Sequence, residues 1–269
     1  MTEKLGMRNV KNIFIMVWVE AMMEIKTRFK YGMSAISDFV VFSITFLAVV
    51  FFTNVKNMNG FYHTTDGIML MLIGYMFWNT GVVAMDVASQ SIESDAKTGI
   101  LESEMQSKFP LWFLLIVRSF ISNILLFIYL ILLSLATVFF AKISLLSLFK
   151  ANLLVFIFSG ITNFGMFGIG LIFGGGSLRF KRLGQWSTML QAGMLLIANV
   201  AIPYEIWPQL VIPFGGGIEI VRMIYLGRSI DTMFVFSFLI INVAWFICGL
   251  TIFNLLIKRE RRVGSFDTF

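Results

Sequence analysis

Long apolar runs alternate with short polar segments along most of this chain. Six of these runs have about the 20 residues that an α-helix needs to cross a bilayer. They cover residues 33–54, 68–90, 111–140, 147–175, 185–203 and 232–257. The pattern predicts an all-α integral membrane protein, with one transmembrane domain over residues 1–269 and six transmembrane helices.

The basic residues predict how these helices are oriented. Sixteen of the 21 lysines and arginines fall on one side of the six-span topology, in the N-terminal segment, the second and fourth connections and the C-terminal tail. Loops rich in lysine and arginine stay in the cytoplasm. We therefore expect cytoplasmic N- and C-termini in a multi-pass protein of a plasma membrane, with bacterial origin as the expected source.

The segment before the first run, residues 10–31, has a different pattern. Apolar residues recur every three to four positions from Phe14 to Phe29, whereas Glu20, Glu24 and Arg28 fall on another face. This spacing is typical of an amphipathic helix that lies on a membrane surface. Glu24 and Arg28 are four positions apart in the order that favours an ion pair.

A second unusual segment, residues 203–226, separates the fifth and sixth runs. It is apolar but contains Pro203, Pro208 and Pro213, followed by three consecutive glycines and Arg222. Because proline interrupts a helix, the segment cannot form one straight span. We expect a short re-entrant hairpin on the outer side, where protein or a wet cavity must cover its irregular backbone.

The composition excludes several classes of function. With 58% hydrophobic and 13% charged residues, the chain is far more apolar than a soluble domain. Its net charge of +6 comes from clusters between the runs, so we expect no nucleic-acid partner. The sequence contains one histidine, one cysteine and no nucleotide-binding loop, so we expect no metal, no cofactor on this chain and no enzymatic activity.

Polar residues inside the apolar runs are candidates for function, because charges and amides are costly in a bilayer. Asn79, Asn163 and Asn199 could form hydrogen bonds between helices or line a transport path. Asp38, Asp86 and Arg118 lie near the inner interface, where snorkelling or mutual pairing, such as Asp86 with Arg118, is favoured over a proton relay. Glycines permit close helix packing, and a series of them lies at positions 160, 165, 168, 170 and 174.

The connection between the second and third runs, residues 93–108, is dense in acidic residues. Glu93 and Asp95 precede Gly99, and Leu101 and Glu102 follow it. The spacing predicts a short amphipathic helix that presents acids to a basic partner on the inner face. An ordinary connecting loop is the alternative interpretation.

These residues resemble a family, the ABC-2 type transporter permeases, which are the membrane subunits of ATP-driven exporters. In that family an acidic stretch followed by Gly-Thr-Leu-Glu and a later Ser-Pro joins spans two and three. Here Gly99-Ile100-Leu101-Glu102 and Phe109-Pro110 occupy those places, with Ile100 and Phe109 as departures. The outer prolines, Arg222, the N-terminal helix and the basic tail are also similar, so the resemblance covers almost the whole chain.

The resemblance implies that separate subunits form the membrane path and bind ATP. Such a permease pairs with a second permease, identical or homologous, and with two ABC ATPase subunits that bind the ATP and magnesium. The residues that would couple this chain to the ATPases are Glu20, Glu24, Arg28, Glu93, Asp95, Gly99, Leu101 and Glu102. The two permeases would form the path for an amphiphilic substrate such as a peptide, drug or lipid-like compound.

Three alternatives remain at this point. A related exporter of lipid-linked glycans would share the same architecture. An ATP-independent channel or secondary transporter would have coupling charges near mid-membrane and an inverted repeat, and the sequence shows neither. A membrane-embedded enzyme would have a catalytic cluster at one interface, which the sequence also lacks.

Overall fold

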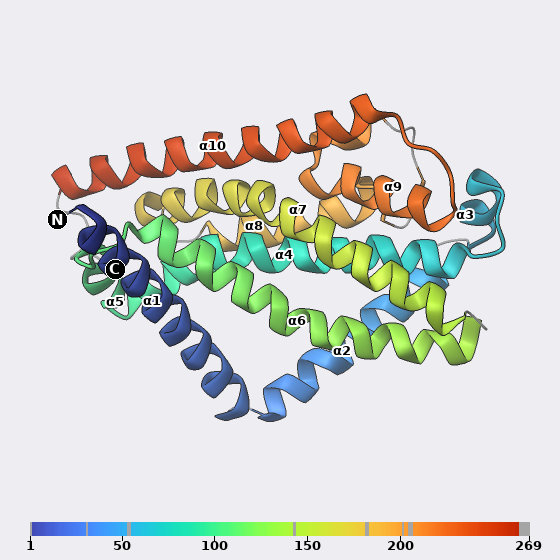
Figure 1. Cartoon of the computed structure of the whole chain (residues 1–269), viewed down its shortest axis with the longest axis horizontal. Coiled ribbons are helices and arrows are strands. Elements are labelled where there is room, and N and C mark those ends of the chain that lie inside the picture. Colours follow the sequence, from blue (N-terminus) through green and yellow to red (C-terminus); the bar gives the residue numbers. More distant parts are fainter. Residues whose placement is uncertain are drawn as a thin grey trace.

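The computed structural model describes residues 2–30, 32–52, 55–141, 144–180, 183–200, 202–203 and 207–263. The side chains of residues 2–11, 28–29, 34–35, 52, 139–141, 208 and 261–263 lie outside this description. Within it, the predicted all-α fold is confirmed (Figure 1). The elements are α1 Thr2–Lys30, α2 Gly32–Phe52, α3 Val55–Tyr62, α4 Gly67–Lys97, α5 Ile100–Met105, α6 Leu111–Ala141, α7 Leu145–Phe180, α8 Gly184–Ile197, the 3₁₀ helix η1 Pro208–Val211, α9 Pro213–Tyr225 and α10 Thr232–Val263.

Four of the described helices are long and apolar enough to cross a membrane. They are α4, α6, α7 and α10, and a fifth span results if α2 and α3, which are bent by 68° relative to each other, count as one. The 14 residues of α8 are fewer than the roughly 20 that a perpendicular span requires. The structure therefore supports a membrane-spanning protein, and the count of six spans stays a prediction.

Helix α4 forms the centre of the bundle. It packs against α6, α7, α8 and α9, and its side chains from Met69 to Phe77 are almost completely buried. Helix α10 lies along one edge against α7, whereas α1 and α2 form a V at the other edge (Figure 1). The beginning of α1, the end of α10 and α5 lie at one end of the bundle, which we call the terminal end; α3 and α9 lie at the opposite end.

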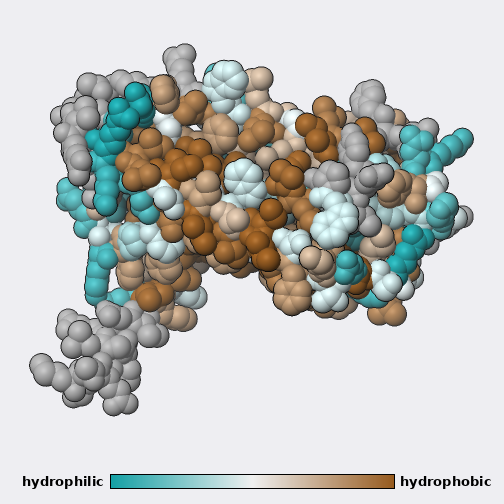
Figure 2. All heavy atoms as spheres, turned by 90° about the horizontal axis from the view of Figure 1, so that it is seen from above, coloured by the Kyte–Doolittle hydropathy of each residue, from teal (hydrophilic) through white to brown (hydrophobic). Residues whose placement is uncertain are grey.

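The surface has the distribution expected for a bilayer. On the face in view, Figure 2 shows hydrophobic residues over the middle of the molecule and hydrophilic residues toward both ends. Large apolar side chains face outward from α6, α7 and α10, among them Ile128, Phe149 and Ile240. Lipid tails can cover such a surface, whereas water would leave it exposed at a large cost in free energy.

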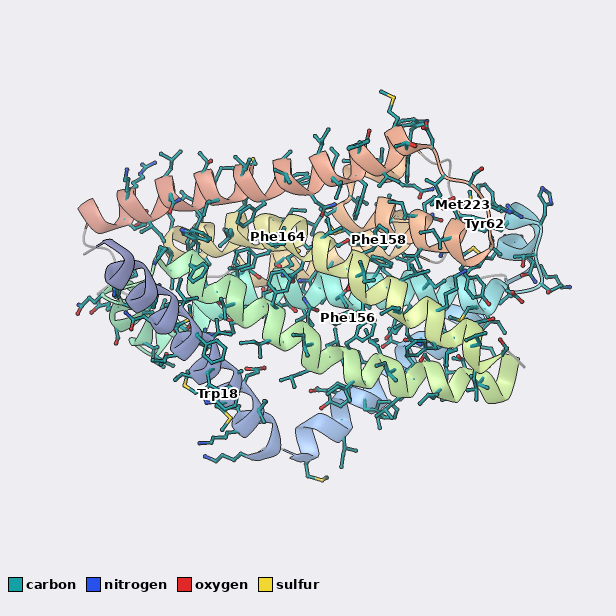
Figure 3. All side chains as sticks on the ribbon, in the orientation of Figure 1. Trp18, Tyr62, Phe156, Phe158, Phe164 and Met223 are labelled. Atoms are coloured by element: carbon teal, nitrogen blue, oxygen red, sulfur yellow. The ribbon has the colours of Figure 1, made fainter. Side chains whose placement is uncertain are left out.

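The predicted N-terminal helix over residues 10–31 is present as part of the longer α1, and its position on a membrane surface stays a prediction. Phe14 and Trp18 are 72% and 60% exposed, so the apolar face is turned outward (Figure 3). The opposite face carries Glu20 and Glu24 to α6, where both carboxylates contact polar side chains. The apolar face is therefore free to contact lipid while the acidic face contacts the protein.

Glycines allow the close packing that the sequence predicts. A Cβ at Gly168 would lie 2.7 Å from the Cα of Phe246 on α10, and one at Gly170 would lie 2.8 Å from the Cβ of Ala88 on α4. Glycines 165 and 174 are equally enclosed. Gly160 differs, because a Cβ there would meet no described atom within 4 Å. Four of the five glycines thus serve helix contacts within this chain.

Candidate functional site

Three acidic side chains from three different helices surround Arg118 of α6 at the terminal end. Its Nη2 lies 2.8 Å from Oε1 of Glu104 on α5. Its Nη1 lies 3.3 Å from Oδ2 of Asp95 near the end of α4, and its Nε lies 3.4 Å from Oε2 of Glu20 on α1. We call Arg118, Glu20, Asp95 and Glu104 the Arg118 junction. It connects the N-terminal helix and the acidic connection to a long helix of the bundle.

Local backbone geometry brings Glu104 to this position. Helix α4 continues to Lys97, and Gly99 then adopts a φ of 74° before α5 begins at Ile100. Glycine adopts this left-handed conformation without the strain that a side chain would cause. Leu101 is buried in the core cluster and anchors α5 against the bundle. The turn and the anchor together direct Glu104 back toward Arg118.

The junction carries more negative than positive charge. One guanidinium faces three carboxylates, and the side chain of Arg118 is only 19% exposed. Among the described residues, the second carboxylate oxygen of Glu104 has no hydrogen-bond partner although it is buried. A partly buried cluster with one cation and three acids attracts further positive charge to this end of the molecule.

The other predicted coupling residues have varied surroundings. Glu24 accepts a hydrogen bond from Ser122 on α6 at 3.3 Å. Glu93 pairs with Lys97 at 2.5 Å and accepts a bond from the backbone N–H of Gly184, at the start of α8. Glu102 is exposed. The side chain of Arg28 lies outside the described part of the chain, so its predicted pair with Glu24 stays a prediction.

The suggested pair of Asp86 with Arg118 is wrong. Asp86 accepts hydrogen bonds from Gln191 on α8 at 2.7 Å and from Gln90 at 2.8 Å. Asp95 takes the place beside Arg118 because α4 extends seven residues beyond the predicted end at residue 90. Sequence reasoning also missed Glu104 and the central role of Arg118, although Arg118 is the only charged residue in its apolar run.

A second polar cluster lies buried at the opposite end, and Arg222 of α9 is its centre. Arg222 has no exposed surface. It donates hydrogen bonds to the carbonyls of Leu70 and Val200 at 2.9 and 3.1 Å, and to Oδ1 of Asn199 at 2.9 Å. Its guanidinium also lies 5.5 Å from the ring centre of Tyr62 on α3. Arg222 thus joins α3, α4, α9 and the segment after α8.

Two neutral side chains connect Arg222 to Glu219, which is 2% exposed. The Tyr62 hydroxyl donates to Oε2 of Glu219 at 2.5 Å and accepts from Arg222 at 3.4 Å. Asn199 donates to the same carboxylate oxygen at 3.2 Å and to Gln209 at 2.7 Å. We call Arg222, Glu219, Tyr62, Asn199 and Gln209 the Arg222 cluster (Figure 3 labels Tyr62). It balances one buried positive charge against one negative charge.

Asn199 explains why the fifth predicted run is interrupted. Helix α8 ends at Ile197, and Asn199 adopts a φ of 58°, a left-handed conformation that asparagine tolerates better than most residues. The backbone therefore turns, and the amide reaches the Arg222 cluster. Pro213 begins α9 as a buried residue, Pro203 lies in irregular backbone, and the side chain of Pro208 is not described.

Near this cluster, burial shifts the pKa of one tyrosine, Tyr225. The Tyr225 hydroxyl donates to Oδ2 of Asp66 at 3.4 Å. Burial, with a smaller contribution from the Asp66 carboxylate, raises the pKa of Tyr225 to about 12. The hydroxyl therefore stays protonated, and can donate to Asp66, at any physiological pH.

The remaining two asparagines differ from each other. Asn79 donates to the carbonyl of Tyr75 on its own helix at 2.8 Å. Asn163 of α7 accepts hydrogen bonds from Ser119 and Asn123 of α6, at 2.8 and 2.7 Å, and forms the predicted bond between helices. It also lines a hollow in the surface between α6 and α7. In the described part of the chain, no group of three or more metal-binding side chains occurs.

Comparison of the sequence with models of known protein families, and with curated proteins, finds no match. The fold therefore defines a class only: a helical protein whose long apolar helices are those of a membrane-spanning protein.

Proposed function

We propose that this chain is the permease subunit of an ABC exporter, in which ATP is hydrolysed by separate ATPase subunits. In this proposal two permease chains, identical or homologous, form the path for an amphiphilic substrate across a bacterial plasma membrane. Six spans, cytoplasmic termini and an outer re-entrant segment over residues 203–226 belong to the same proposal. The resemblance to ABC-2 type permeases supplies its framework.

The Arg118 junction is the observation that carries the proposal. An exporter of this kind must transmit movement of a soluble ATPase to helices in the membrane. The junction ties α1, α4 and α5 to α6 by one charged contact each, at distances from 2.8 to 3.4 Å. Force applied to α1 or α5 would therefore reach a long apolar helix directly.

The exposed surface next to the junction supports an interaction with a basic partner. Glu102 is exposed on α5, immediately beside the buried anchor Leu101. The junction itself holds two more carboxylates than cations. Complementary charge accelerates and orients the association of two proteins. We therefore place the ATPase contact on α5 and on the adjoining end of α4.

A transporter that works without ATP is less well supported. Coupling by ions or protons requires charged side chains in the transport path near mid-membrane. In the described part of the chain, Arg222 and the partly buried Arg118 lie with their acidic neighbours toward opposite ends of the bundle, and Ser119 and Asn163 form an uncharged contact between α6 and α7. The amides and hydroxyls there carry no charge that could couple to a gradient.

The test is to purify the chain in mild detergent from membranes of its own cells and to assay vanadate-sensitive ATP hydrolysis. We expect a protein with a nucleotide-binding loop to co-purify. Glu102→Lys should reduce its recovery about tenfold, which corresponds to about 1.4 kcal/mol of binding free energy.

Lys150→Glu is the matched control, because Lys150 is exposed on α7 and its charge reversal lies at the opposite end of the bundle. This variant should retain the ATPase. The proposal would be overturned if no ATPase co-purified with the natural sequence or with either variant. It would also be overturned if both charge reversals reduced the recovery of the ATPase equally.

A further inference from the structure

Two adjoining hollows lie in the surface between α6 and α7, and the functions discussed above do not use them. The larger has a volume of about 590 Å³ and is lined mainly by apolar side chains, including Ile131, Leu135 and Leu153. The smaller has a volume of about 250 Å³ and lies farther along the same two helices, at Asn123 and Asn163. Both are lined by Phe127 and Phe156, whose ring centres are 5.1 Å apart. We call the two hollows together the α6–α7 groove.

The groove follows one face of each helix. On α7, residues 152, 156, 160 and 163 line it, at steps of three to four residues. On α6, residues 123, 127, 131 and 134 line it with the same spacing. Such positions share one side of an α-helix. Asn152 and Asn163 lie 11 positions apart on α7, so about 16 Å of the groove separates them.

Buried amide groups with unused hydrogen-bonding atoms line both hollows. Asn163 is 2% exposed, and its Oδ1 accepts two hydrogen bonds, while its Nδ2 has no partner among the described residues. Its neighbour Asn123 donates to Asn163, and its Oδ1 likewise has no described partner. Asn152 is 8% exposed and donates to Ser134 and Leu148, which leaves its Oδ1 unbonded within the described structure.

An unsatisfied buried polar atom costs about 1–3 kcal/mol. A ligand that supplies the missing partners would recover this free energy. Asn123 and Asn163 line the smaller hollow, so a rotation of their amides would present the unbonded carbonyl and N–H groups to a ligand there, and the other residues that line it are uncharged. This combination matches a neutral group that both accepts and donates a hydrogen bond, of which a hydroxyl group is the simplest. The apolar lining of the larger hollow matches an aliphatic chain.

We propose that the α6–α7 groove binds a single-chain amphiphile from the bilayer, with its neutral hydroxyl or carboxylic acid group at Asn123 and Asn163. Its aliphatic chain extends past Phe127 and Phe156 toward Asn152. The large apolar side chains at the rim, such as Ile124 and Ile157, are exposed, so the ligand can enter sideways from the lipid. This proposal does not depend on the ATPase contact and stands if that contact fails.

Gly160 provides a variant that blocks the groove without disturbing the helix. It lines the smaller hollow, and a Cβ there would meet no described atom within 4 Å. Gly160→Phe should therefore fill the hollow while α7 keeps its packing. Gly193 of α8 is the matched control, because a Cβ there would also meet no described atom within 4 Å and the residue lies outside the groove.

The experiment uses the full chain in phosphatidylcholine nanodiscs with a photoactivatable long-chain alcohol, and adducts are mapped by mass spectrometry. We expect adducts concentrated on α6 and α7. In Gly160→Phe the alcohol would lose two or more hydrogen bonds and the contacts of its aliphatic chain. This labelling should therefore fall about tenfold. Gly193→Phe should label like the natural sequence, and thermal unfolding should show that both variants are folded.

A second variant keeps the proposal testable if Gly160→Phe does not fold. Asn123→Leu retains side-chain volume but removes the acceptor, so labelling by the alcohol should fall, whereas labelling by a photoactivatable hydrocarbon of the same length should not. Equal labelling of the groove by the alcohol and the hydrocarbon in the natural sequence would show ordinary lipid contact and would overturn the proposal. A change of oligomeric state in Gly160→Phe, with no alcohol adducts in the groove, would show that a second copy covers it and would also overturn the proposal.

Discussion

The Nε atom of Arg118 lies 3.4 Å from Oε2 of Glu20, although the two residues are 98 positions apart in the sequence. This contact holds α1 to α6, and those to Asp95 and Glu104 hold α4 and α5 to the same helix. Removing the cation would leave three carboxylates facing one another. The effect on stability should therefore exceed the loss of any one ion pair.

Arg118→Met should lower the free energy of unfolding by about 2 kcal/mol. This lies between the roughly 0.2–1 kcal/mol of exposed ion pairs and the roughly 3–5 kcal/mol lost when a buried pair is broken. Thermal unfolding in detergent measures the effect, and limited proteolysis should show faster cleavage within α1. Lys258→Met, a substitution of an exposed cation on α10, is the control and should change neither result. Unchanged proteolysis of α1 in Arg118→Met would contradict this role of the junction.

The Arg222 cluster leads to a prediction about two charges that do not touch directly. Arg222→Met would leave Glu219 buried without a cation, and this should cost about 3–5 kcal/mol. Adding Glu219→Gln removes the uncompensated charge, so the double variant should be more stable than Arg222→Met alone. A double-mutant cycle of thermal unfolding measures the coupling. Strictly additive effects would show that Tyr62 and Asn199 do not transmit the interaction between the charges.

The Tyr62 hydroxyl is one of the two groups that link these charges. Tyr62→Phe removes the donor to Glu219 and the acceptor for Arg222 while it keeps the ring. Buried partners left without a hydrogen bond cost about 1–3 kcal/mol, and we expect a loss of stability in this range. Tyr225→Phe removes a hydroxyl that donates one long hydrogen bond, of 3.4 Å, to Asp66, so its loss should be smaller. Equal losses would contradict the special role of Tyr62.

The sequence was sufficient to predict the long helices, because their signal is local. Apolar periodicity predicted α1, and length and composition predicted α4, α6, α7 and α10. The partners of Arg118 were not predictable in this way, because Glu20 is 98 residues away and Glu104 reaches it only through the turn at Gly99. The error over Asp86 has the same origin, since a charged last turn extended α4 beyond its apolar run and placed Asp95 beside Arg118.

The interruption after α8 shows a similar limit. Residues 185–203 are apolar enough to suggest a span, but the helix ends at Ile197. The left-handed Asn199 is stabilised by contacts to Arg222, Gln209 and Glu219, all of which follow it in the chain. A tertiary network therefore determines where this helix ends. The helix propensities of residues 185–203 do not by themselves indicate that α8 ends at Ile197.

Close packing of α7 against α10 provides the last prediction. A Cβ at Gly249 would lie 2.5 Å from the carbonyl carbon of Gly168 and 2.7 Å from its Cα. Both are backbone atoms, so no rotation of a side chain can relieve the collision. Gly249→Ala must push α10 away from α7, and overpacking of this kind costs about 1–3 kcal/mol or more.

Gly193→Ala is the matched substitution, because a Cβ there meets no described atom within 4 Å. Alanine is favoured over glycine in a helix by about 0.5–1 kcal/mol, so this variant should unfold at the same or a higher temperature than the natural sequence. Thermal unfolding of both variants in one detergent compares them directly. A stable Gly249→Ala would mean that α10 is not held against α7 at this distance, and the close contact between these two helices would have to be abandoned.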